Sequence, residues 1–311
     1  MSDALDDTIS QVPDFLIIGA MKAGTTAIAE VMNCHPEIYI PESKEPSYFI
    51  DRDEEFIFSD KKKGKYIHGP RTKKAYLDLF KSAPLHTLKG EASTQYMANP
   101  TSPKLVHDAN PDTKLIVVLR EPISRAFSAY SYNKTIQREQ AGTFSEALCE
   151  EISGARDSYY FSFRYLHYGL YAQHLARWRQ FFPSKQIKIL LFDDFKNNQP
   201  EFFADIAEFL GVGEFVSLGN PSLDNRTVRP KNRLQKTLWY LMEAPHPLKL
   251  MLKKYLNNNM LAKLKKLLKS HLIKVGVSPL KLTEKDRTII GNYFAEDLVR
   301  LKNEFGVVFE R

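Results

Sequence analysis

Residues 15–26 read FLIIGAMKAGTT and predict a strand, a tight loop and the start of a helix. The first four, Phe15 to Ile18, form an unbroken apolar run, as in a parallel strand that is buried on both faces of a sheet. Gly19 and Gly24 then frame four residues, and two threonines follow. In loops of this kind, backbone N–H groups and a helix N-terminus cradle a phosphate. We therefore predict a phosphate-binding loop.

This loop departs from the pattern of nucleotide triphosphatases at one position. Their pattern, GxxxxGK[ST], requires a lysine directly after the second glycine. Here Thr25 occupies that place, and the lysine of the loop is Lys22. The loop is therefore predicted to bind a phosphate other than the β- and γ-phosphates of a magnesium-bound triphosphate.

A second strand-to-helix turn lies in residues 114–130, KLIVVLREPISRAFSAY. Arg120 ends the apolar strand, Pro122 suits the first turn of a helix, and Ser128 follows Arg120 by eight residues. Ligands bind at the carboxyl ends of strands in open α/β sheets, and a guanidinium binds phosphate through two parallel hydrogen bonds. A triphosphatase would carry an aspartate for magnesium at such a strand end. The turn therefore predicts a second phosphate site without a metal ligand.

Two separate phosphate sites suit 3′-phosphoadenosine 5′-phosphosulfate (PAPS), and on both motifs the chain resembles the PAPS-dependent sulfotransferases. The resemblance implies PAPS as sulfuryl donor, its product PAP, and no metal. Residues implied to hold the 5′ end are Lys22, Ala23, Gly24, Thr25 and Thr26, and those implied to hold the 3′-phosphate are Arg120 and Ser128.

Residues 40–49, IPESKEPSYF, resemble the segment that carries a catalytic glutamate in the carbohydrate branch of this family, which includes the heparan sulfate enzymes. Glu45 matches that glutamate, and Glu42 is the fallback. A positioned carboxylate can accept the proton of an acceptor hydroxyl, and a cation such as Lys22 can stabilise the leaving phosphate. Lys44 and Glu45 are the candidate acceptor contacts. The alternative for Glu45 is a loop carboxylate paired with Lys44.

Two departures leave the acceptor open. Ala92 stands where the heparan sulfate enzymes would have a lysine, and Ser47 stands where some members have a histidine. The histidine base of the phenol- and steroid-sulfating branch has no match, and His35 is expected to be structural. We expect a hydroxyl acceptor on a carbohydrate, with a small-molecule or lipid alcohol as the alternative. Variable loops at 51–71 and 137–166 are expected to form its pocket.

Two basic segments follow. Lys231, Asn232 and Arg233 lie in a loop that would close over the 3′-phosphate by resemblance, although a solvated charge run explains it equally well. Residues 236–275 hold nine lysines and one glutamate. We interpret them as a basic helical segment with a solvated lysine face. The alternatives, in order, are contact with an anionic carbohydrate and peripheral contact with a membrane. No nucleic-acid-binding module is recognised.

The whole chain of 311 residues is 43% hydrophobic and 26% charged, with a formal net charge of +7, which is ordinary for a soluble globule. Residues 1–11 are predicted to be a disordered tail, and 12–311 a single domain. With two cysteines, no secretory leader pattern and no apolar run of about 18 residues, we expect a cytoplasmic protein. The oligomeric state stays open.

Alternating elements predict an α/β fold, a P-loop-like three-layer sandwich with a central parallel sheet flanked by helices. The expected strands are 87–90, 115–119 and 187–192. The expected helices are 72–81, 102–109, 169–182, 200–210 and one that starts at Thr283 with Asp286 in a capping box.

Two rival functions remain. One is a P-loop kinase or triphosphatase, which magnesium-dependent ATP binding would support. The other is a catalytically inactive protein that binds PAP or anionic glycans, against which the presence of Lys22 and Glu45 argues.

Overall fold

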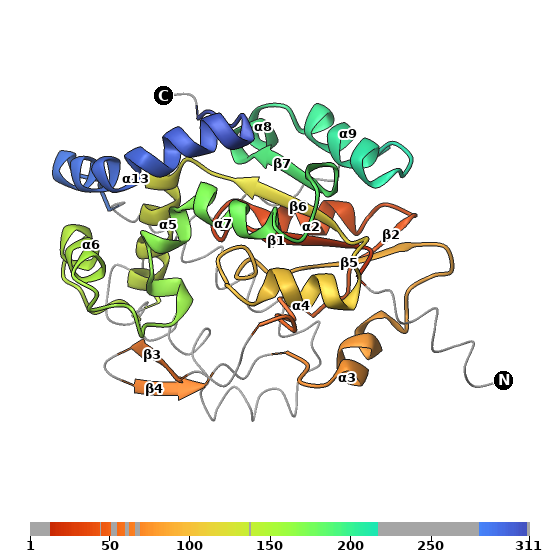
Figure 1. The fold of residues 1–311 in the computed structure, drawn as a ribbon, viewed down its shortest axis with the longest axis horizontal. Coiled ribbons are helices and arrows are strands. Elements are labelled where there is room, and N and C mark those ends of the chain that lie inside the picture. Colours follow the sequence, from red (N-terminus) through yellow and green to blue (C-terminus); the bar gives the residue numbers. More distant parts are fainter. Residues whose placement is uncertain are drawn as a thin grey trace, which may run out of the picture.

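The computed structural model describes residues 13–43, 45–50, 55–59, 62–65, 69–136, 138–216 and 280–309. Their core is a five-stranded sheet with helices on both faces, the predicted α/β fold (Figure 1). The strand order is β2 (Ile38–Tyr39), β5 (Leu88–Ala92), β1 (Phe15–Gly19), β6 (Lys114–Leu119) and β7 (Ile187–Leu191). All neighbouring strands in this sheet run parallel.

The apolar run of residues 15–18 forms most of the central strand β1, which is buried on both faces of the sheet. Every residue of β1 is buried, and Leu16 pairs with Glu91 on one side and Leu115 on the other. A parallel strand covered on both faces needs apolar side chains in both directions. Because all five strands run the same way, the segments that follow β1, β5 and β6 meet at one edge of the sheet.

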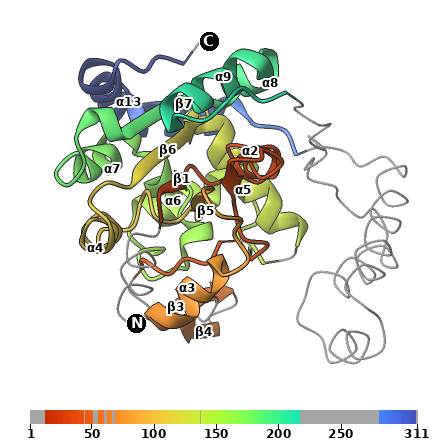
Figure 2. The same ribbon diagram turned by 90° about the vertical axis from the view of Figure 1, so that its right-hand side faces the viewer.

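Helices cover the two faces of the sheet. Figure 2 shows α4 (Ser102–Ala109) and α7 (Tyr171–Trp178) on one side and α2 (Thr25–Met32) on the other. The remaining elements near the sheet are α3 (Lys73–Leu77), α5 (Pro122–Thr135), α8 (Phe192–Asn197) and α9 (Gln199–Leu210). The layers agree with the predicted sandwich.

A second apolar cluster joins α5 to α6 (Phe144–Ile152) and α13 (Glu284–Phe305). Phe144 and Leu148 of α6 and Phe294 of α13 are buried in it. The capping box predicted at the start of α13 is present, since Thr283 and Asp286 exchange side-chain-to-backbone hydrogen bonds.

Three sequence-based expectations need correction. The helix expected to reach residue 182 ends at Trp178, and Pro183 disfavours helical backbone only in the residue directly before it. Phe192 begins α8 instead of ending β7. The expected loops are partly regular, with the antiparallel pair β3 (Glu55–Ser59) and β4 (Lys62–Lys65) in one and α6 in the other.

Other expectations have mixed outcomes. His35 is buried, its Nε2 lies 3.0 Å from the carbonyl oxygen of Gly213, and its Nδ1 accepts the N–H of Glu37, which confirms a structural role. Cys34 and Cys149 are both exposed and unbridged. The tail 1–11, Lys44, the loop of Lys231, Asn232 and Arg233, and the segment 236–275 lie outside the described residues. Among the described helices, none is long and apolar enough to cross a bilayer.

Candidate active site

The predicted phosphate loop connects β1 to α2 at the carboxyl edge of the sheet. Gly24 is the N-cap of α2, with φ at 79°, and the first turn of this helix has neither an acidic residue nor a side-chain cap. A Cβ at Gly24 would lie 2.6 Å from the ring of Phe192. Glycine is therefore required by both the backbone and the space, and the positive end of the helix dipole suits an anion.

Arg120 lies directly after β6 and reaches the phosphate loop. Its Nη1 donates to the carbonyl oxygen of Lys22 at 3.2 Å, and its Cζ lies 5.2 Å from the ring centroid of Phe192. Burial lowers the pKa of Arg120, although the charges of neighbouring acidic groups partly offset this effect. A guanidinium held in such a place gains from an anionic ligand. The structure thus brings the two predicted phosphate motifs together.

Helix α5, which carries Ser128 of the second motif, also contacts the phosphate loop. The Glu121 carboxylate caps the helix by accepting the N–H groups of Ile123 at 2.9 Å and Ser124 at 2.7 Å. Ser128 lies half-buried on this helix, and Tyr132 follows one turn later on the same face. The Nζ of Lys22 lies 4.4 Å from the centroid of the Tyr132 ring, a cation–π contact.

Glu45 is half-buried and held from the end of β5. The hydroxyl of Thr94 donates to its Oε1 at 3.0 Å, and the hydroxyl of Ser47 donates to its backbone carbonyl at 3.0 Å. Glu42, the fallback, is exposed. Glu45 therefore has a hydroxyl contact just after the carboxyl end of β5, whereas Glu42 is exposed.

Beneath Glu45 lies a second carboxylate, Glu91, which is fully buried on β5. It accepts hydrogen bonds from the hydroxyls of Ser93 and Tyr96, both at 2.6 Å. Burial, with a smaller contribution from the nearby charge of Glu45, raises the pKa of Glu91 to about 7 against the lowering effect of these hydrogen bonds. Sequence reasoning missed this residue. The available signal was an acidic residue inside a strand pattern, followed by hydroxyl side chains.

The buried histidines His167 and His174 are poor proton acceptors. Burial, reinforced by the charge of Arg164, lowers the pKa of His167 to about 3. Burial likewise holds the pKa of His174 well below its usual range. A base for hydroxyl chemistry near neutral pH should have a pKa closer to the working pH. Neither histidine therefore rivals Glu45.

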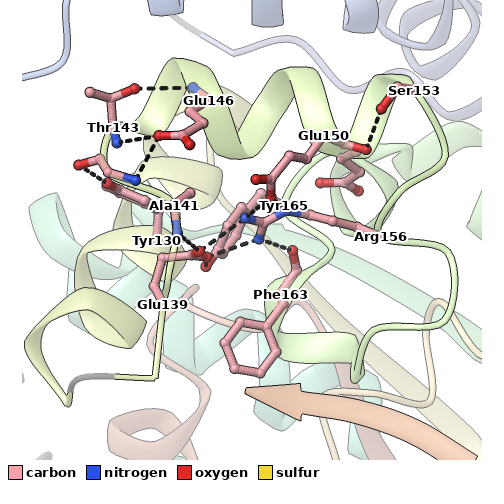
Figure 3. Close-up of polar contacts among 12 residues, drawn as sticks. Tyr130, Glu139, Ala141, Thr143, Glu146, Glu150, Ser153, Arg156, Phe163 and Tyr165 are labelled. Carbon is pink, nitrogen blue, oxygen red and sulfur yellow. Dashed lines mark hydrogen bonds and ion pairs between the residues drawn. The ribbon is translucent and has the colours of Figure 1, made fainter. Parts of the chain in front are cut away.

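A buried ionic network anchors residues 138–165, part of the segment expected to line the acceptor pocket (Figure 3). Arg156 donates to both carboxylate oxygens of Glu139 at 2.9 Å and to Glu150 at 2.6 Å. The hydroxyl of Tyr165 also donates to Glu139. Hydrogen bonds therefore hold this segment in one arrangement.

Comparison with known proteins identifies the family. The sulfotransferase domain family matches residues 12–226. The chain belongs to this sulfotransferase family. The sulfotransferase chain is 27% identical to heparan sulfate glucosamine 3-O-sulfotransferase 5 of Homo sapiens over 194 residues, 60% of this chain and 49% of that protein. It is 30% identical to heparan sulfate glucosamine 3-O-sulfotransferase 6 of Homo sapiens over 210 residues, 66% of this chain and 54% of that protein.

Among solved structures, the sulfotransferase from Alicyclobacillus acidocaldarius superposes with a TM-score of 0.70 at 25% identity, covering 96% of this chain and 97% of the other. The predicted family and fold are thereby confirmed. The chain spans only about half the length of the human relatives named above. The roles of individual site residues stay predictions.

Proposed function

We propose that this sulfotransferase-family chain transfers the sulfuryl group of PAPS to an acceptor hydroxyl, with a carbohydrate as the favoured acceptor. The observation that carries the proposal is the contact between Arg120 and the backbone of Lys22, 3.2 Å long. This contact supports the binding of two phosphate groups of one ligand, because a fixed guanidinium and a helix N-terminus lie together at one edge of the sheet.

The described residues fit this donor. The first turn of α2 offers backbone N–H groups without a competing acid, and Gly24 lets the chain pass close to Phe192. Arg120 and Ser128 would hold the 3′-phosphate. The donor supplies an activated sulfuryl group, whose bond to the phosphate oxygen breaks as a new sulfur–oxygen bond forms with the acceptor.

Glu45 and Lys22 then have complementary roles. Glu45 would accept the proton of the acceptor hydroxyl, which makes the oxygen more nucleophilic as it attacks. Lys22 would stabilise the negative charge that develops on the departing phosphate. Tyr132 would keep the ammonium of Lys22 at the loop through its ring face. The proton, the sulfuryl group and the leaving group are all accounted for without a metal.

The carbohydrate acceptor is supported by the names of the relatives, which are heparan sulfate glucosamine sulfotransferases. Ala92 and Ser47 are the positions where the chain departs from the pattern of the heparan sulfate enzymes, so another carbohydrate hydroxyl fits as well. A carbohydrate hydroxyl remains the favoured acceptor, and an anionic glycan is one candidate for it. A cytoplasmic location and a role for Lys231, Asn232 and Arg233 at the 3′-phosphate complete the proposal.

Thermal unfolding tests the donor site. A ligand present at 100 times its dissociation constant adds about 2.7 kcal/mol of stability. We expect PAP to raise the unfolding midpoint, Arg120→Ala to abolish the rise, and Arg287→Ala, an exposed arginine of α13, to keep it. A rise with ATP and magnesium but none with PAP would contradict the proposal and support a phosphotransferase.

Turnover of radiolabelled PAPS with heparan sulfate, heparosan and chondroitin tests the chemistry. Loss of a general base costs about 10²- to 10⁴-fold in rate, so Glu45→Gln should lower kcat by this factor and leave PAP binding unchanged. Glu42 is an exposed glutamate near Glu45 and serves as the matched control, so Glu42→Gln should retain activity. PAP binding without transfer to any acceptor would favour an inactive binding protein.

A further inference from the structure

The backbone that carries Glu45 has an uncommon conformation. The φ angles of Glu45 and Ser47 are 47° and 51°, in the left-handed region that side-chain-bearing residues rarely adopt. Such a conformation persists only where surrounding groups hold it. The contacts of residues 45–49 therefore decide where the Glu45 carboxylate lies.

Two hydroxyl relays connect this segment to one buried carboxylate. The N–H of Ser47 donates to the hydroxyl of Ser93 at 2.9 Å, and that hydroxyl donates to Oε2 of Glu91 at 2.6 Å. The N–H of Phe49 donates to the hydroxyl of Tyr96 at 3.4 Å, and that hydroxyl donates to Oε1 of Glu91 at 2.6 Å. Both oxygens of Glu91 thus support amides of the same short segment.

We propose that Glu91 is a positioning residue for Glu45, which it holds in place through the hydroxyls of Ser93 and Tyr96. The inference rests on the proposed function, in which Glu45 is the base. Glu91 has no exposed surface and sits behind the segment, so it acts through these relays and does not touch the acceptor. A base displaced by 1 Å can cost about 10²-fold in rate, which gives such support a catalytic effect.

Both relays require Glu91 to be ionised. Each hydroxyl already accepts a backbone N–H and donates to one oxygen of Glu91, and a proton on either oxygen would oppose one of those donors. The groups that face Glu91 among the described residues are Tyr96 from its own strand end, Tyr76 from α3, and Glu45. Since the pKa of Glu91 is raised to about 7, the relays should weaken as the pH falls through neutrality.

Amide hydrogen exchange of the full chain tests the relays without an acceptor. In Glu91→Gln at pH 8, at least one of the amides of Ser47 and Phe49 should exchange at least tenfold faster than in the wild type, because the new side-chain amide nitrogen opposes one of the two hydroxyl donors. Asp297→Asn is a matched control, because Asp297 is a buried carboxylate that accepts two backbone N–H groups at the start of α7. It should leave both amides protected.

Kinetics with PAPS and the acceptor that the wild type uses provide the second readout. Glu91→Gln should lower kcat about ten- to hundredfold with unchanged PAP affinity. In the wild type, kcat should decrease as the pH falls through 7. In Glu91→Gln, this decrease should be absent from the pH profile. Should Glu91→Gln fail to fold, Ser93→Ala should release only the Ser47 amide, and Tyr96→Phe only the Phe49 amide.

The two proposals fail differently. Undiminished turnover in Glu45→Gln would remove the proposed base. Wild-type exchange, kcat and pH profile in Glu91→Gln, alongside an inactive Glu45→Gln, would overturn the positioning role alone.

Discussion

Replacing Arg156 by methionine should lower the free energy of unfolding by about 3–5 kcal/mol at pH 8. The side chains of Arg156 and Glu139 are only 1% and 2% exposed, and two of the hydrogen bonds between them measure 2.9 Å. Methionine fills the volume but leaves the Glu139 carboxylate buried without its counter-charge. That carboxylate would keep only the Tyr165 hydroxyl and the Ala141 N–H.

The loss should depend on pH in a defined direction. Burial alone would raise the pKa of Glu139, but hydrogen bonds and charge from Arg156 overcome this effect and hold the pKa below its usual range. Stability from such a group is present above its unfolded pKa and lost as the pH falls through its folded value. Without Arg156, the buried carboxyl can take up a proton instead, so the deficit should be smaller at pH 5 than at pH 8.

Urea denaturation curves at both pH values measure the effect. Arg300→Met is the matched control, because Arg300 pairs with Glu304 on the surface at 2.9 Å and the two side chains are 40% and 43% exposed. An exposed pair of this kind contributes about 1 kcal/mol or less. Adding Glu139→Gln to Arg156→Met should recover part of the loss. Equal losses in Arg156→Met and Arg300→Met would refute the reasoning.

Three further changes have defined outcomes. Gly24→Ala should lower the free energy of unfolding by about 1–3 kcal/mol and weaken PAP binding, because φ is 79° there and the ring of Phe192 blocks the Cβ. As a control, the Cβ of Gly291→Ala in α13 would meet nothing within 4 Å, and this variant should stabilise the protein. Tyr132→Leu should lower kcat about three- to tenfold by removing the ring face under Lys22, a contact that contributes roughly 1 kcal/mol, while Tyr132→Phe should keep the wild-type rate. Glu91 has a raised folded pKa of about 7, so the stability it contributes is full below its unfolded pKa and is lost as the pH rises through neutrality. Glu91→Gln should therefore lose roughly 3 kcal/mol less than the wild type between pH 4 and pH 9, and parallel curves would contradict the assignment.

The parts of the fold that follow from local pattern were predictable from the chain alone. An apolar run ending in a glycine loop specifies a buried parallel strand and the start of a helix, whatever lies elsewhere. For the same reason both ends of α4, the C-terminal end of α9 and the capping box of α13 agree with the sequence-based prediction. The short helix α6 was missed, because its apolar spacing is brief and lies within a polar stretch.

The support of the candidate site depends on strand order, which local pattern does not encode. Glu91 lies 46 residues from Glu45, and the two come together because β2, which leads into the Glu45 segment, pairs with β5. The ring of Tyr132 reaches Lys22 for a similar reason, since β6 lies on the other side of β1 and leads into α5. The two motifs therefore predict phosphate binding from sequence alone, because a few neighbouring residues specify the backbone geometry that such binding needs. Which side chains hold the base and the cation in place is settled by packing between distant segments, where burial and hydrogen-bond partners are properties of the whole sheet.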